Sequence, residues 1–218
     1  AERADSALDH RHRATLSALY DLPYCKTRQN WLLKNLVGNW EFAPVYTFQT
    51  GSWATLQSVS DSNLNGDSAP DRVVVNPNGV NNTGSGVTAL TNTGGQTVGY
   101  LAANPNARYI VAGKGMYPDA ARNTYQLPPI QNIDISLVKR FNITEHMNLQ
   151  LIGQASNLFN HPQYMGGWLN DVAGANTAVT TSTQVRNFLN PSSSTFNRPD
   201  LVFPSNPRLL QLSAKFTF

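Results

Sequence analysis

Residues 210–218 have the sequence Leu-Gln-Leu-Ser-Ala-Lys-Phe-Thr-Phe, in which every even-numbered position is apolar and every odd-numbered position is polar. Successive side chains of a β-strand point to opposite faces of its sheet. Strict alternation over this length therefore predicts a strand with one apolar face and one polar face. Such a strand must bury its apolar face either in a protein core or in lipid.

The same alternation recurs along the chain. It predicts five strands, near residues 12–22, 38–50, 130–141, 146–157 and 207–218. Each can supply the roughly 9–11 residues that a tilted strand needs to cross a bilayer. Pro44 is the main objection, because a proline in a strand removes a ladder hydrogen bond and belongs on an edge or at a bulge.

The connections between these segments alternate between short and long. A tight turn separates the third and fourth segments, whereas residues 51–129 and 158–206 form long stretches rich in Asn, Gly, Ser, Thr and Pro. Residues 27–37 favour a short helix between the first two segments. Short turns on one rim and long loops on the other are typical of outer-membrane barrels.

Composition narrows the class of protein further. Charged residues make up 13% of the chain, about half the usual share, and 24 of its 218 residues are Asn. The net charge of +3 is small and dispersed, which argues against nucleic acid as a partner. The single cysteine excludes an internal disulfide framework.

These patterns favour an all-β fold, an antiparallel up-and-down transmembrane β-barrel segment of about five spanning strands with long polar loops on one rim. We expect residues 1–218 to form a single segment of this kind. A soluble β-sandwich binding module is the alternative, because the same alternation can fill a closed core. In the barrel interpretation, the polar side chains would line either a solute path or a hydrated wall. These polar positions are Glu41, Asp134, Gln150, Gln154 and Lys215.

Several stretches resemble the C-terminal part of TonB-dependent outer-membrane receptors of the Oar-like, carboxypeptidase-regulatory-like type. The most specific is Asn157-Leu158-Phe159-Asn160-His161-Pro162-Gln163-Tyr164, followed by Asn206-Pro207-Arg208 before the closing strand. Others are Asp9–Arg13, Gly38–Trp40 with Phe48–Gly51, Asn65–Asp67 with Pro70–Arg72, and Asn132–Lys139. A plug domain and a TonB box are not found in the chain, so the resemblance implies the last strands of a larger barrel.

The resemblance implies the bacterial outer membrane as the location, and energised uptake of a bulky, unidentified solute as the function. The implied partners are the lipid bilayer, TonB through an N-terminal part, and the barrel-assembly machinery through the strand that ends at Phe218. A non-energised porin-like or structural outer-membrane protein is the alternative function. We expect no enzymatic activity and no cofactor other than calcium, which is considered next.

One loop has the spacing of a calcium site. Oxygen-bearing side chains alternate around Gly66 at Asp61, Asn63, Asn65 and Asp67, and Asp71 follows. Arg72 occupies the twelfth position, where a calcium loop carries a bidentate acid, so we expect weak calcium binding. The alternative is a turn whose Asn and Asp side chains bond their own backbone.

Overall fold

The computed structural model describes residues 3–24, 30–66, 70–144, 146–164 and 183–218. Within them the chain forms two compact units. The sheet unit comprises Arg11–Thr50, Pro129–Gln163 and Ser205–Phe218, and the loop unit comprises Ala1–His10, Gly51–Pro128 and Tyr164–Pro204. Among the described helices, none has the length and apolar character needed to cross a membrane.

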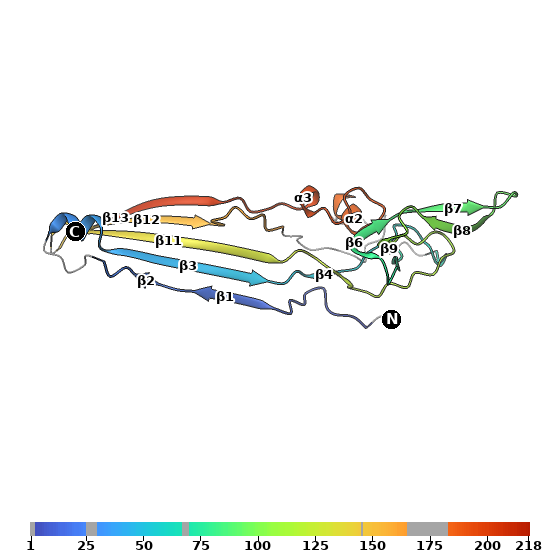
Figure 1. Ribbon diagram of the computed structural model, residues 1–218, viewed down its shortest axis with the longest axis horizontal. Helices are drawn as coiled ribbons and strands as arrows, with labels where there is room; N and C mark the ends of the chain where they lie inside the picture. The colour runs from blue at the N-terminus through green and yellow to red at the C-terminus, as the bar shows by residue number, and fades with distance from the viewer. Residues whose placement is uncertain (1–2, 25–29, 67–69, 145, 165–182) are drawn as a thin grey trace. The chain divides into compact units, whose positions relative to one another are not determined.

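The sheet unit is one antiparallel sheet whose strands lie side by side in the order β1-β3-β11-β12-β13, with β2 also paired to β3 (Figure 1). The strands are β1 (Arg13–Ser17), β2 (Tyr20–Asp21), β3 (Trp40–Gln49), β11 (Ile130–Asn142), β12 (Asn148–Ser156) and β13 (Leu209–Thr217). Neighbours in the sheet follow chain order, so the all-β, antiparallel up-and-down fold is confirmed. In the described residues β1 and β13 are free edges, and the sheet is not closed into a barrel.

Pro44 lies in β3, which has neighbours on both sides, although a proline in a strand usually occupies an edge or a bulge. The Pro44 carbonyl accepts a hydrogen bond from the Ala18 amide at 3.2 Å. The amide and carbonyl of one antiparallel residue face the same neighbour, so the missing N–H of Pro44 faces Ala18. The first strand is interrupted there, between β1 and β2, while pairing of Pro44 with Ile135 on the other side is intact.

The helix expected over residues 27–37 is present as α1 (Trp31–Leu36), and residues 27–29 lie outside the described residues. The Asn30 side-chain oxygen accepts the Leu32 amide at 3.0 Å. This bond caps the first turn of the helix. After Gly38, Asn39 adopts a left-handed backbone with φ of 59°, which ends the helix and starts β3.

The loop unit gives the two long connections a folded structure of their own. Its elements are β4 (Trp53–Ala54), β5 (Val74–Val75), β6 (Val80–Ser85), β7 (Val87–Thr91), β8 (Thr97–Ala102), β9 (Ala107–Ile110), β10 (Tyr125–Gln126), α2 (Thr183–Leu189) and α3 (Pro199–Val202). They form three small sheets, β10-β4, β5-β9-β6 and the hairpin β7-β8, in which only β6 and β9 run parallel.

An aromatic cluster fills the core of the loop unit. Tyr125 and Phe188 are fully buried with ring centroids 6.0 Å apart, and Phe188 packs edge-on against Phe203 at 4.8 Å. Tyr109 and Phe196 complete the cluster around Tyr125. Burial raises the pKa of the Tyr125 and Tyr109 phenols above the ordinary tyrosine value, because the ionised form would lose its hydration.

Candidate functional site

The register of the sheet unit gathers the apolar positions of all its strands on one face. Leu137 is paired with Phe42 on one side and Gly153 on the other, and Gly153 is paired with Leu212. Residues directly opposite each other across an antiparallel pair share a face. The described residues of this apolar face are Ala14, Leu16, Ala18, Tyr20, Trp40, Phe42, Pro44, Tyr46, Phe48, Gln131, Ile133, Ile135, Leu137, Lys139, Phe141, Leu149, Leu151, Gly153, Ala155, Leu210, Leu212, Ala214, Phe216 and Phe218.

Among the described residues of the sheet unit, none forms a protein layer over most of this face. Leu212 in β13 is 88% exposed and Leu16 in β1 is 68% exposed. A water-facing monomer rarely exposes a contiguous apolar patch larger than a few hundred Å². A face of this extent requires an apolar solvent or partner.

Aromatic side chains mark the rim of the apolar face where the short turns lie. Trp40 begins β3, Phe141 lies next to the end of β11, and Phe216 is opposite Leu149 near the end of β13. The Phe216 and Phe218 rings stack with centroids 6.0 Å apart. Aromatic girdles at this level of a spanning strand are typical of the membrane interface.

The opposite face of the sheet is polar. By register it carries all five positions expected to line a solute path or hydrated wall: Glu41, Asp134, Gln150, Gln154 and Lys215. Thr, Gln, Asn and Ser fill most of the remaining positions on the described strands. Hydrated groups of this kind suit the lumen of a barrel.

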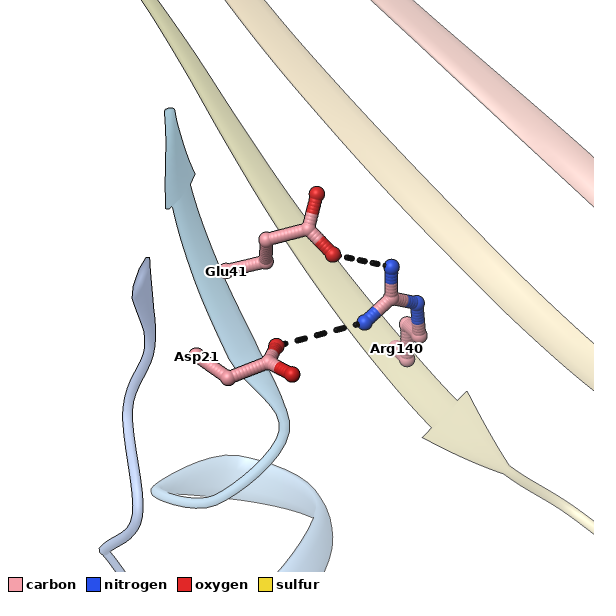
Figure 2. A network of polar contacts seen from close by, with 3 residues as sticks. All are labelled: Asp21, Glu41 and Arg140. Carbon is pink, nitrogen blue, oxygen red and sulfur yellow. Dashed lines mark hydrogen bonds and ion pairs between the residues drawn. The ribbon is translucent and has the colours of Figure 1, made fainter. Parts of the chain in front are cut away.

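An ion-pair network joins three strands on the polar face. Arg140 of β11 donates a hydrogen bond to the Glu41 carboxylate in β3 and lies 3.7 Å from the Asp21 carboxylate in β2 (Figure 2). Sequence analysis did not single out Arg140 or its pairing. Alternation places Arg140 on the polar face, but its partners depend on the register, which alternation leaves open.

A second polar network lies at the end of the sheet opposite the short turns. We name it the Asn157–Gln163 clasp, after its two buried side chains. The Asn157 amide group donates to the carbonyls of His161 at 2.9 Å and Asn206 at 2.8 Å, while its oxygen accepts the His161 amide at 2.9 Å. The Gln163 oxygen accepts the Gln131 amide at 2.6 Å, and its nitrogen donates to the Gln131 carbonyl.

The clasp gives the stretch with the most specific resemblance a structural role. Asn157 has a φ of 51°, a left-handed backbone that asparagine tolerates better than most residues. The backbone amide of Asn157 donates a hydrogen bond to the Asp134 carboxylate at 2.9 Å. The network ties β11, the exit from β12 and the entry to β13 together, so the stretch fixes the geometry of three chain segments.

The two faces determine which side of the sheet meets lipid. A charged side chain that faces the hydrocarbon is destabilising, by an amount that rises toward the bilayer midplane. Asp134, Arg140 and Glu41 therefore place the polar face toward water, and the apolar face is left toward the hydrocarbon. The sheet unit is a membrane-spanning β-sheet of the barrel type.

The comparison with known families agrees with this class. The chain belongs to the outer membrane beta-barrel domain family, whose model matches residues 1–192. The protein is accordingly an outer-membrane barrel protein of bacteria, and the soluble β-sandwich interpretation is wrong. Neither curated proteins nor solved structures gave a match to the chain.

The candidate calcium loop lies in the loop unit, and Asp67 falls outside the described residues. The Asp71 carboxylate accepts hydrogen bonds from the Ser62 amide at 2.6 Å, the Ser62 hydroxyl at 2.9 Å and the Asn63 amide at 2.9 Å. The Asn63 side-chain nitrogen donates to its other oxygen at 2.9 Å. Asp71 thus organises the loop from inside.

The remaining oxygen-bearing residues of the loop bond its backbone as well. Asp61 accepts the Asn65 amide at 3.2 Å and the Gly66 amide at 3.0 Å, and the Asn63 oxygen accepts the Asn65 amide at 3.0 Å. Among the described residues, no three acidic, His or Cys side chains converge as a metal site. The loop has the hydrogen bonds of the turn interpretation, and calcium binding stays a prediction.

Proposed function

We propose that this chain forms part of the barrel wall of a TonB-dependent receptor that takes up a bulky solute across the outer membrane. The proposal assigns the chain a passive part in transport, with no catalytic step. The sheet unit supplies wall and lumen surface, and the loop unit supplies the folded long connections of the chain. Uptake would be energised through an N-terminal part of the complete protein.

The folded loop unit is the observation that carries the proposal. Residues 51–128 and 164–204 are both connected to the sheet at the rim opposite the short turns, and their described residues share an aromatic core. Long connections on that rim of a barrel are extracellular. A stable surface domain of this size suits a receptor that captures a large solute at the cell surface.

The unpaired edges of the sheet favour a larger barrel with further strands. About eight strands are the practical minimum for closure, and transporters with a plugged lumen have about 22. The edges of β1 and β13 must be paired in the membrane, since unpaired backbone groups in hydrocarbon cost several kcal/mol each. We infer that further strands of the same protein pair with them. We also infer that β13, with its alternating pattern through Phe218, is the strand recognised by the barrel-assembly machinery.

The second candidate is a non-energised porin-like protein. The hydrated polar face, with Gln150, Gln154 and Gln211 on neighbouring strands, favours it, because an open lumen lined in this way conducts ions. The two candidates differ in whether a plug occupies the lumen. They also differ in whether the protein contacts TonB.

Two measurements on the complete protein separate the candidates. Reconstituted in a planar lipid bilayer, a plugged receptor should show no steady conductance, whereas a porin should show ohmic channels. Photo-cross-linking in cells should join the receptor to TonB, and inactivating the proton-motive force should change the yield. Stable open channels together with an absence of TonB cross-links would overturn the receptor proposal.

A further inference from the structure

The connection between β2 and β3 is held against the rim of the sheet by specific bonds. The Asn35 side chain is buried, and it accepts the Asn142 amide at 3.0 Å and donates to the Asn142 carbonyl at 3.4 Å. An amide that satisfies both backbone groups of a strand end substitutes for a ladder partner. Helix α1 is therefore fixed to the last residue of β11.

Lys139 makes a second attachment, on the apolar face. Only 4% of the residue is exposed, and its ammonium donates to the carbonyls of Leu36, at 3.0 Å, and Gly38. Cations are favoured near the free carbonyls at the C-terminus of a helix. The ammonium also lies 4.8 Å from the Trp40 ring centroid and 5.3 Å from that of Phe141. The charge on the apolar face is thus shielded by α1 and two aromatic rings.

Docked in this way, α1 exposes apolar side chains. Leu32 is 61% exposed and Leu36 is 67% exposed, and Val37 follows them. The short turn between β11 and β12 is more polar, since its exposed described residues are Thr144 and His146 beside one apolar residue, Ile143. A connection whose polar groups are bonded inward and whose leucines point outward is suited to the boundary between headgroups and acyl chains.

A groove runs from α1 onto the apolar face. Its volume is about 560 Å³, and its side chains include Leu36, Trp40, Leu137, Leu151 and Leu212. Gly153 forms part of its floor, because the absence of a side chain there leaves a gap between its neighbours. A Cβ at this position would lie 3.6 Å from the nearest Leu212 methyl group.

We propose that α1 inserts into the periplasmic leaflet of the outer membrane and that the groove holds one acyl chain of a phospholipid. The groove is continuous with the face that meets lipid in this family, and short turns mark the periplasmic rim. Apart from Ser213 and Lys139 its lining residues are apolar, and the ammonium of Lys139 is already bonded to the carbonyls of Leu36 and Gly38. The inference rests on family membership and does not depend on the receptor proposal.

The position of α1 can be tested by spin labelling. The complete protein, carrying Cys25→Ser, is assembled in vesicles of phosphatidylethanolamine and phosphatidylglycerol with a nitroxide at Leu36→Cys. Collisions with oxygen should exceed those with a water-soluble nickel chelate. A label at Thr144→Cys is the matched control and should favour the chelate. If the label at position 36 behaved like the control, α1 would lie in water and the proposal would fail.

Lys139→Met tests the attachment of α1. Methionine keeps the apolar face suitable for lipid but removes the ammonium that bonds the helix carbonyls. The label at position 36 should then gain chelate accessibility, while the heat-modifiable electrophoretic mobility of the folded barrel is kept. An unchanged label would show that Lys139 does not hold the helix.

The groove is tested by filling it. Native mass spectrometry of the detergent-extracted protein should show a retained phosphatidylethanolamine, and Gly153→Leu should abolish its retention. Ala155→Leu places the same leucine side chain on the same face of β12 outside the groove and should leave the lipid bound. Equal retention in both variants, or no retained lipid in the unmodified protein, would overturn the acyl-chain site.

Discussion

Replacing Leu137 with arginine is the sharpest test of which face meets lipid. Leu137 is 39% exposed on the apolar face of the central strand β11. It lies five positions before Asn142, where β11 ends at the short-turn rim. A spanning strand advances about 3.3 Å per residue and tilts by about 40°, so each residue covers about 2.5 Å of depth.

These values place Leu137 about 12 Å from the rim, near the middle of an apolar band about 25 Å tall. Leu137→Arg should therefore lower the free energy of unfolding by about 2–4 kcal/mol. Leu149 lies opposite Phe141, next to the rim. Leu149→Arg should cost only about 0–1 kcal/mol, because penalties fall toward the interfaces.

Ser136→Arg is the matched control, since it adds the same side chain at the same depth on the polar face. That face also carries Asp134, which would attract the new guanidinium. Denaturant titration of the complete protein in phospholipid vesicles gives all three free energies. The reasoning would be refuted if Leu137→Arg cost no more than Ser136→Arg, or less than Leu149→Arg.

Three further outcomes follow from the clasp and the loop unit. Gln163→Ala should destabilise the sheet unit by about 1–3 kcal/mol, because it leaves both backbone groups of Gln131 without that partner; denaturant titration measures the loss, and an unchanged midpoint would contradict it. The 61–71 loop should bind calcium only at about millimolar concentration, because the ion must displace the amides bonded to its carboxylates; calorimetry that shows no heat up to about 10 mM would remove the site. Because burial raises the folded pKa of Tyr125 above 10.0, the stability that Tyr125 contributes to the loop unit should be fully present below about pH 10 and be lost as the pH rises further. Thermal melts against pH should show this loss reduced in Tyr125→Phe, and equal losses in both proteins would exclude Tyr125 as its source.

The faces of the spanning strands could be predicted from the sequence because they depend on a local property. Alternation fixes the parity of each residue, and parity alone determines the face. The glutamines and charged residues expected on one face are found together there for this reason. Parity leaves the register free to shift by two residues, however, so the contact of Arg140 with Glu41 and Asp21 could not be predicted.

The loop unit lay beyond this reasoning for a different physical reason. Its strands have two to six residues, too few for a period to be visible. Its core also draws single residues from distant segments, such as Leu56, Tyr125 and Phe188. Polar composition predicted irregular loops there, because a small core needs few apolar residues and leaves the average of the segment polar.

Two polar residues interrupt the apolar face of β11. They indicate how deep the strand lies in the membrane, which the alternation alone does not. Gln131 lies toward the long-loop end, where the Gln163 side chain bonds its backbone, and Lys139 lies toward the short-turn end beneath α1. The stretch between them contains only Ile133, Ile135 and Leu137 on the apolar face. Measured from Asn142 at the short-turn rim, Lys139 lies about 8 Å inside an apolar band about 25 Å tall, and Gln131 lies about 28 Å from that rim, close to the far boundary. Gln131 thus marks the far membrane boundary and Lys139 lies just inside the near one, and at each position a connecting segment supplies the hydrogen bonds that lipid cannot.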